Sequence, residues 1–583
     1  MKAFALLLAL AFVAQGAVPI RFRTERPGFV SLNIYRADGT LARQLLSGTP
    51  FAAGDHETAW DAAAGGAPLP PGEYAWRAVI HDGLALKLRG TVGDFGGDRG
   101  IPGATAADEA LVFLGWSLTT AAADAVVACD PAGTVRWTHR RGALSGCRAL
   151  AADGGVVFVL GGEGDDAEGA ALYKLSAKDG TPIPWPDGRT DLRITSLWPA
   201  DGKNKPELAD HMAVRNGRIY LSFTAGEFMA ILDSKTGAYL QTAVGAPPGA
   251  VDAVATQSDL PGKPGKLEAA DFVVTALKGG VIGKLLLMHD PIWVVVSDLT
   301  PLDRDERITA IAIIGDGAKH HMHDIFTALA LPLHQVHARS AFATAGFTYV
   351  AGKAGGRPAL GPWQPDRMQS IRALALDAAG QLWVAEGDSV PGRVSVWSTD
   401  KPEGRLVREF FAPPAGAAAV NPRDPALIFA GGCEWRIDAQ TGRAACLGVI
   451  TRDAMRAARY VLENERTLLV LTPAGEGADV VFERKGDGDW QPSATPAPAV
   501  PALPLTLHQE ADGVWQFVSA DGFALGTAFP AAESPIAATI TASPDGKISI
   551  AASRTRTGSY ALTGLETLRP LAEGKVIIAP AQR

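Results

Sequence analysis

The fold is decided by the segment RALALDAAGQLWVAE (372–386), which is followed by VSVWSTDKPEGRLVREFF (394–411). In both stretches, a run of apolar and β-branched residues leads into a turn containing Gly or Pro and then into a second such run, the pattern of a β-hairpin. Two successive hairpins supply four short antiparallel strands, which is the usual content of one β-propeller blade. The segment therefore predicts one four-stranded blade.

The same unit recurs along the long C-terminal part of the chain. Further first hairpins are RALAADGGVVFVLGG (148–162), HMAVRNGRIYLSF (211–223), NPRDPALIFAGG (421–432) and ATITASPDGKISIAAS (538–553). Further second hairpins are VVACDPAGTVRWTH (126–139), LYKLSAKDGTPIPW (172–185), MAILDSKTGAYLQT (229–242) and CEWRIDAQTGRAAC (433–446). A repeat of about 35–65 residues predicts a propeller of about seven or eight four-stranded blades over 105–583.

Two stretches interrupt this repeat. The pattern blurs over 245–345, where a blade is expected to be irregular. The proline-rich segment QPSATPAPAVPALP (491–504) is expected to be extended, either as a domain boundary or as a long loop between blades. Both possibilities stay open, and with them whether 505–583 belongs to the same propeller.

The N-terminal residues 17–95 show a different β pattern. In FVSLNIYRADGTLARQLLSG (29–48), Val30, Leu32 and Ile34 alternate toward one face, and Asp38-Gly39 supplies a turn with positive φ. The segments HETAWD (56–61) and YAWRAVI (74–80) read as further strands. We therefore expect an all-β protein in which a small β-sandwich precedes the propeller.

This N-terminal module resembles the Ig-like domain of FlgD type, which occurs in flagellar hook capping proteins and on many secreted bacterial proteins. The matching residues are Ile34, Tyr35, Gly39, Leu41, Arg43, Leu45, Gly54, His56, Trp60, Asp61, Leu69, Pro70, Gly72 and Tyr74. The resemblance implies that Trp60 and Tyr74 are core residues and that His56 and Asp61 are structural. Ala62 departs from the family pattern, which has Gly after Trp-Asp.

The C-terminal part resembles two kinds of propeller repeat. The turns LDSKTGAYL (232–240) and IDAQTGRAA (437–445) look like those of quinoprotein-type repeats, and residues 334–397 look like NHL repeats. The combination is similar to exported bacterial proteins that pair a FlgD-type domain with NHL-like blades. The resemblance fixes no activity.

The first 16 residues have the features of a signal peptide. Lys2 precedes the apolar run AFALLLALAFVA (3–14), and Ala14-Gln15-Gly16 offers small residues for cleavage. The run is shorter than the ~20 residues of a membrane-spanning helix. We expect a periplasmic or secreted protein that begins at Ala17 or Val18 and has no membrane span.

Charge and cysteine content narrow the possible partners and chemistry. The formal net charge of −8 argues against a nucleic-acid partner, which needs a basic surface. Cys433 and Cys446 flank the 438–442 turn at nearly opposite positions, which predicts a disulfide bond suited to an oxidising compartment. Cys129 and Cys147 are a second predicted pair.

The loop 352–363 and the following strands carry the candidate ligand site. Arg357, Trp363, Glu386 and Arg393 would together suit a polar, ring-bearing ligand such as a sugar, because Arg donates in a fixed fork and Trp stacks on rings. The alternative is a brace between blades, in which Arg357 pairs with Glu386 and Trp363 packs beneath them.

Metal chemistry is the other possibility that we consider. The resemblance to NHL-type lyases makes His321, His323 and His334 candidate zinc ligands, although His334 also occupies a position where NHL repeats carry a structural His. Quinoprotein propellers hold calcium, but the chain has no Cys-Cys pair, and Asp residues in the repeat turns are explained as turn formers. We therefore expect no cofactor, with zinc or calcium as the alternative.

The function that follows is a periplasmic or secreted scaffold that binds an extracellular ligand or cell-surface partner, such as a carbohydrate or a surface polymer. The alternative is a metal-dependent NHL-type lyase or a hydrolase that acts on an extracellular substrate.

Overall fold

The computed structural model describes residues 17–579, with gaps, and between 251 and 351 it describes the strands by their backbone alone. The gaps are 65, 96–101, 117–124, 140–145, 162–170, 195–210, 216, 224–227, 244–250, 258–270, 278–280, 289–291, 296–306, 314–324, 331–335, 340–347, 352–356, 370, 378, 380, 387–389, 399–402 and 500–501. The expected signal peptide, residues 1–16, lies outside the described residues.

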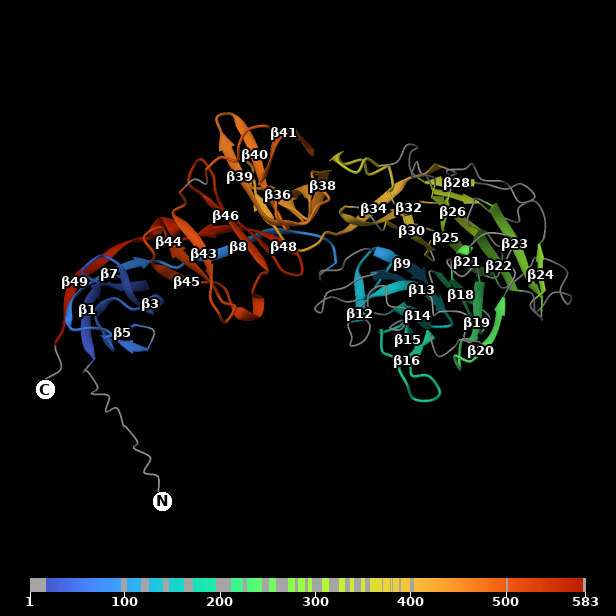
Figure 1. The fold of residues 1–583 in the computed structure, drawn as a ribbon, viewed down its shortest axis with the longest axis horizontal. Helices are drawn as coiled ribbons and strands as arrows, with labels where there is room; N and C mark the ends of the chain where they lie inside the picture. Colours follow the sequence, from blue (N-terminus) through green and yellow to red (C-terminus); the bar gives the residue numbers. More distant parts are fainter. Residues whose placement is uncertain are drawn as a thin grey trace, which may run out of the picture.

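The described chain is an all-β protein made of three bodies along one axis (Figure 1). Besides strands, it contains the short 3-10 turns η3 (Ala531–Glu533) and η4 (Leu565–Thr567). We call the bodies the N-terminal sandwich, the middle body and the ring. No helix in the described part of the chain has the length and apolar character needed to cross a membrane.

The N-terminal sandwich consists of two main sheets that share one apolar core. Its strands are β1 (Val18–Thr24), β2 (Gly28–Tyr35), β3 (Leu41–Phe51), β4 (Gly54–Trp60), β5 (Ala63–Ala64), β6 (Ala67–Pro68), β7 (Gly72–His81) and β49 (Arg569–Ile578). β1 pairs with β4, and the second sheet has the order β3-β2-β7-β49. Val30, Leu32 and Ile34 are fully buried in the core between the sheets, as their alternation predicts.

The core and turns of this body match several sequence-based expectations. Trp60 and Tyr74 are buried against each other, with ring centroids 5.3 Å apart in an edge-to-face arrangement. Gly39 has the expected positive φ, at 83°. Ala62, which follows Trp60-Asp61, has a φ of 55°, in the left-handed region that favours glycine.

The ring is formed by six sheets among the described residues, each of four or five strands. The sheets are β9 (Pro102–Ala107), β10 (Val112–Trp116), β11 (Val126–Cys129) and β12 (Val135–His139); β13 (Cys147–Asp153), β14 (Val156–Gly161), β15 (Ala171–Ser176) and β16 (Asp191–Arg193); β17 (His211–Arg215), β18 (Arg218–Phe223), β19 (Phe228–Asp233) and β20 (Tyr239–Ala243); β21 (Val251–Gln257), β22 (Asp271–Leu277), β23 (Val281–Met288) and β24 (Ile292–Val295); β25 (Arg307–Ile313), β26 (Ile325–Ala330), β27 (Val336–Arg339), β28 (Thr348–Ala351) and β33 (Glu403–Gly404); and β30 (Ile371–Leu376), β31 (Leu382–Glu386), β32 (Gly392–Trp397) and β34 (Leu406–Ala412).

The first strands of these sheets contact one another in a closed, propeller-like order. β9 contacts β13, β13 contacts β17, β17 contacts β21, β21 contacts β25, β25 contacts β30, and β30 contacts β9 again. Residues 372–411 supply the sixth sheet, as their two hairpins predict.

The middle body contains four further sheets in the part of the chain that the structure describes. They are β29 (Gly361–Pro362) with β35 (Ala418–Val420), β36 (Leu427–Ala430), β37 (Cys433–Ile437) and β38 (Ala444–Val449); β39 (Met455–Glu463), β40 (Arg466–Pro473), β41 (Val480–Gly486) and β42 (Asp489–Pro492); β43 (Leu505–Gln509), β44 (Trp515–Ser519) and β45 (Ala524–Phe529); and β46 (Ala537–Ala542), β47 (Ile548–Ser553) and β48 (Thr557–Thr563) with β8 (Ala85–Val92). The expected count of seven or eight blades in one propeller is not confirmed, because these sheets lie outside the contact order of the ring.

The three bodies are nested in the chain rather than arranged one after another. The last strand, β49, pairs with β7 of the N-terminal sandwich, and β8 pairs with β48 of the middle body. The chain thus runs from the sandwich through the middle body to the ring and returns by the same route (Figure 1). The expected boundaries at residues 95 and 105 therefore separate strands that the structure joins in one sheet.

The N-terminal sandwich is attached to the middle body by buried polar side chains. The hydroxyl of Ser31 donates to the carbonyl of Ala524 at 2.5 Å, and the Asn33 amide donates to the carbonyl of Gly522 at 2.9 Å. His81 Nε2 donates to the carbonyl of Leu525 at 2.9 Å. These contacts explain why the face of β2 opposite its apolar side is also buried.

Candidate functional site

The structure brings all four predicted ligand-site residues together, and it buries three of them. Glu386 ends β31 and accepts from both arginines: Arg357 Nη2 lies 2.8 Å from its Oε2, and Arg393 Nη1 lies 2.7 Å from its Oε1. The side chains of these three residues are at most 1% exposed. This is the Arg357–Glu386 pair that the brace alternative predicts.

Trp363 and Glu409 complete what we call the arginine–glutamate network, with Arg357, Glu386 and Arg393. The Arg357 guanidinium carbon lies 4.0 Å from the centroid of the Trp363 ring, within the range of a cation–π contact. Trp363 Nε1 donates to Glu409 Oε2 at 3.2 Å, and Arg393 Nη2 lies 2.7 Å from the same oxygen. Because each charge already has a partner inside the protein, the network has the arrangement of a brace.

The segment that contains Trp363 connects the ring to the middle body. β29, which immediately precedes Trp363, pairs with β38, and the Trp363 N–H donates to the carbonyl of Leu447. Glu386 and Arg393 belong to the sixth sheet of the ring. A ligand-binding role of these residues stays a prediction.

The network predicts an unusual pH dependence of stability. Burial raises the pKa of Glu409 from its ordinary value of 4.5, while Arg393 acts in the opposite direction. The folded protein therefore holds this proton more tightly than the unfolded chain, so the contribution of Glu409 to stability is complete below pH 4.5 and is lost as the pH rises through the raised pKa. We expect Glu409→Gln to remove this loss, measured as melting temperature from acidic to neutral pH.

A matched control is Glu483→Gln. The Glu483 pKa is lowered, mainly by a hydrogen bond from Lys485, so its contribution to stability has the opposite sign of pH dependence and is lost as the pH falls. Melting curves of Glu409→Gln that run parallel to those of the parent protein at every pH would contradict the role given to Glu409.

The described part of the chain does not contain the three candidate metal ligands. His321, His323 and His334 lie outside the described residues, so neither the expectation of no cofactor nor its zinc or calcium alternative is tested. Within the described ranges, no three His, Cys, Asp or Glu side chains are grouped so that they could hold a metal ion.

The Asp residues of the repeat turns act as turn formers, as the sequence predicts. Asp233 Oδ1 accepts from the N–H of Thr236 at 2.7 Å and from its hydroxyl at 2.8 Å. Asp438 Oδ1 accepts from the N–H of Thr441 at 2.7 Å and from its hydroxyl at 2.8 Å. The two turns therefore use the same local hydrogen bonds.

The two predicted disulfide bonds are not formed. All four cysteines are buried free thiols. Counted from the turn, Ile437 pairs with Ala444 and Trp435 pairs with Cys446, whereas Cys433 lies opposite Val449, beyond a bulge between Glu434 and Trp435. Burial raises the pKa of the Cys446 thiol, and it raises that of Cys129 to about 12, so neither sulfur is an activated nucleophile.

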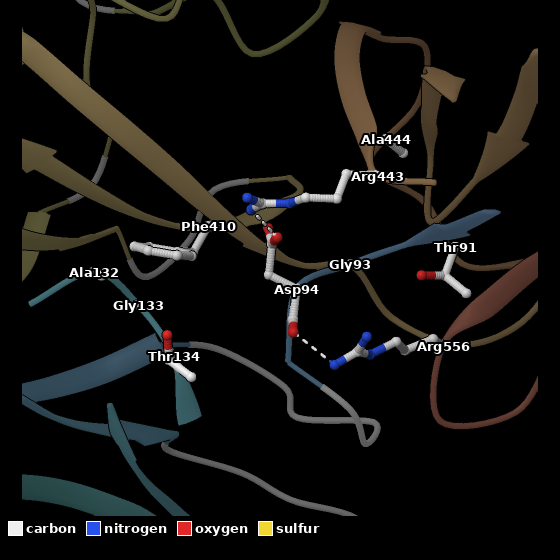
Figure 2. A pocket seen from close by; sticks show the side chains of 10 residues that line it. All are labelled: Thr91, Gly93, Asp94, Ala132, Gly133, Thr134, Phe410, Arg443, Ala444 and Arg556. Atoms are coloured by element: carbon white, nitrogen blue, oxygen red, sulfur yellow. Dashed lines mark hydrogen bonds and ion pairs between the residues drawn. The ribbon is translucent and has the colours of Figure 1, made fainter. Parts of the chain in front are cut away.

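A cleft of about 290 Å³ lies where the ring meets the middle body. Its lining comes from the end of β8 and the segment after it, two hairpins of the middle body and two sheets of the ring: Thr91, Gly93, Asp94, Ala132, Gly133, Thr134, Phe410, Arg443, Ala444 and Arg556. Figure 2 shows the guanidinium groups of Arg443 and Arg556 directed toward Asp94, with Phe410 and Thr134 on the opposite side. The volume is close to the lower end of the range for small-molecule sites.

Asp94 forms hydrogen bonds or an ion pair with residues from three of the segments at the cleft. Its Oδ1 forms an ion pair with Arg443, its Oδ2 accepts from the N–H of Phe411 at 2.8 Å, and its own N–H donates to the Phe411 carbonyl at 2.8 Å. Arg556 Nη2 donates to the Asp94 carbonyl at 2.7 Å. Two of the chain segments that cross between the middle body and the ring are thus bonded to each other at the cleft.

Sequence analysis missed every residue of this cleft. The ten lining residues come from five separate segments, and those that fall in repeat turns, such as Arg443 and Ala444 in 437–445, share their pattern with turns that do not line the cleft. Only the fold brings them together, so the sequence held no usable signal.

Comparisons with known proteins do not place the chain in a family. No family model matches it, and no curated protein matches it in sequence. Among solved structures, it is similar to the computationally designed Ika8 protein (12% identity, 69% of this chain and 99% of that one, TM-score 0.30). It is also similar to AztD from Citrobacter koseri (11% identity, 67% and 92%, TM-score 0.27) and to BamB from Moraxella catarrhalis (12% identity, 70% and 98%, TM-score 0.26).

Proposed function

We propose that the protein is an exported binding scaffold that holds a small polar ligand in the cleft between the ring and the middle body. The observation that carries this proposal is the cleft itself, whose walls come from both bodies and whose polar groups converge on Asp94. Ligand sites occur preferentially at such junctions between domains, and a few convergent polar groups give them specificity. A carbohydrate or a part of a cell-surface polymer would suit these walls.

The proposal extends to the architecture that carries the cleft. The ring would be a six-bladed propeller, since its six described sheets contact one another in a closed order. The N-terminal sandwich would be an Ig-like domain of FlgD type, closed by the last strand of the chain. The periplasmic or secreted location is supported by the features of residues 1–16.

The test is a thermal-shift screen with a panel of neutral sugars, acidic sugars, sugar phosphates and dicarboxylates. A ligand that binds only the folded protein raises its melting temperature, by the equivalent of about 2.7 kcal/mol at a concentration 100 times its dissociation constant. We expect at least one member of the panel to raise the melting temperature of the parent protein. We expect Ala132→Trp, which fills the cleft from an exposed turn, to abolish that shift.

The matched control places the same bulky side chain on a similar turn away from the cleft. Ala379 is exposed in the turn between β30 and β31 and does not line the cleft. Ala379→Trp should keep the shift seen with the parent protein. A panel without any active member, or a shift that survives in Ala132→Trp, would overturn the proposal.

A further inference from the structure

The charges that line the cleft do not balance, and this imbalance carries a more specific inference that rests on the proposed function. The lining contains two guanidinium groups, Arg443 and Arg556, and one carboxylate, Asp94. Both oxygens of Asp94 are occupied, one by Arg443 and the other by the N–H of Phe411. Asp94 is therefore committed to its present partners and leaves the cleft with a net positive charge.

Arg556 is the cation that has no carboxylate partner among the described residues. Among the described residues, its side chain makes one hydrogen bond, from Nη2 to the backbone carbonyl of Asp94 at 2.7 Å. The side chain is otherwise exposed. A guanidinium has five N–H donors in a planar fork that matches the two oxygens of a carboxylate or phosphate. Most of this donor set is available to a ligand.

The remaining walls favour an anion carried on a compact polar body. Phe410 supplies a small aromatic contact, because only 4% of the residue is exposed, and its ring tip lies so close to Gly133 that a Cβ there would be 2.2 Å from it, which fixes that side of the cleft. Thr91 and Thr134 add hydroxyl groups, which can donate or accept. A volume of about 290 Å³ fits a ligand of monosaccharide size.

From these observations we infer that the cleft is a site for a small organic anion, in which a carboxylate or phosphate pairs with Arg556 while a sugar-sized body contacts Phe410. Arg443 attracts the anion through the field of its charge, and its ion pair holds Asp94 in place. Affinity for the anion falls as ionic strength rises, because Arg556 is exposed to solvent and its charge is screened.

Three sugars that share one ring test this inference: glucose, glucuronate and glucose 6-phosphate. Calorimetric titration of the full chain should detect binding of at least one of the two anions and much weaker binding of glucose. Removing the charged partner with Arg556→Gln should weaken binding of that anion by about 10- to 100-fold. Arg554→Gln, which removes the same charge from an exposed position two residues away that does not line the cleft, should leave the affinity unchanged.

The outcomes separate the anion inference from the binding function and identify the acidic group. Binding of glucuronate alone assigns a carboxylate, and binding of glucose 6-phosphate alone assigns a phosphate. Equal binding of glucose and both anions, or an Arg556→Gln variant that binds the anion as well as Arg554→Gln does, overturns the anion inference but leaves the binding function standing. If neither anion binds while other panel members shift the melting temperature, the anion inference also fails.

Discussion

Replacement of Glu386 by glutamine is expected to lower the free energy of unfolding by about 3–5 kcal/mol, the usual cost of leaving a buried charge without its partner. The variant keeps the shape of the side chain but removes the negative charge that Arg357 and Arg393 share. Arg393 retains Glu409, whereas Glu386 is the carboxylate that pairs with Arg357. The loss is measured by urea-induced unfolding, followed by tryptophan fluorescence.

Two further variants make this result specific to the buried charge. Glu57→Gln removes a carboxylate from an exposed pair with Arg21, whose side chain is 79% exposed, and should cost at most about 1 kcal/mol. Adding Arg357→Met to Glu386→Gln should recover part of the lost stability, because it removes the unpaired cation and retains an apolar chain over Trp363. If Glu386→Gln is no more destabilising than Glu57→Gln, the network does not brace the molecule.

The strands of this protein were predictable because hairpins are local. The expected hairpins at 148–162 and 538–553 correspond to β13–β14 and β46–β47, since apolar alternation and Gly-containing turns act within a few residues. The same holds for Val30, Leu32 and Ile34 on the core side of β2. Alternation alone did not predict that Ser31 and Asn33 would also be buried, because their partners lie almost 500 residues away.

The nesting of the bodies could not be predicted from the repeat. A local pattern says nothing about the pairing of β49 with β7 at the other end of the chain. Sequence order placed the sheets of the middle body after those of the ring as further blades, and their hairpins carry the same pattern. Which sheets close a ring depends on long-range packing, which a local pattern does not contain.

Long-range packing also explains which of the predicted site contacts the structure contains and which it does not. The pairing of Arg357 with Glu386 was foreseen as one alternative, because an Arg in a glycine-rich loop and a Glu at a strand end were expected to meet between neighbouring sheets. The predicted Cys433–Cys446 disulfide is not formed, because the turn pairs Ile437 with Ala444 and so places Trp435 opposite Cys446, a register that the spacing of the two cysteines does not reveal. The cleft around Asp94 is formed by contacts between the ring and the middle body, so it could not be predicted from the sequence.

The attachment of the N-terminal sandwich to the middle body gives the second large expected effect. Gly48 has a φ of +53°, and a Cβ there would lie 2.3 Å from the carbonyl oxygen of Leu525 and 2.8 Å from Cα of Gly526. Its N–H also donates to Ser31 Oγ, which in turn donates to the carbonyl of Ala524. Gly48→Ala should cost about 1–2 kcal/mol for the left-handed backbone and about 1–3 kcal/mol for the steric clash.

Gly39→Ala separates the two costs, since Gly39 has a φ of +83° in the same body and no atom within 4 Å of its added Cβ. It should show the backbone cost alone, so the difference between the two variants measures the close approach of the sandwich to the middle body. The clash should also speed hydrogen exchange in β45 for Gly48→Ala but not for Gly39→Ala, because only the former pushes the two surfaces apart. Equal losses of stability with unchanged exchange in β45 would mean that the sandwich is not held at Leu525, and the nested arrangement would then need another point of attachment.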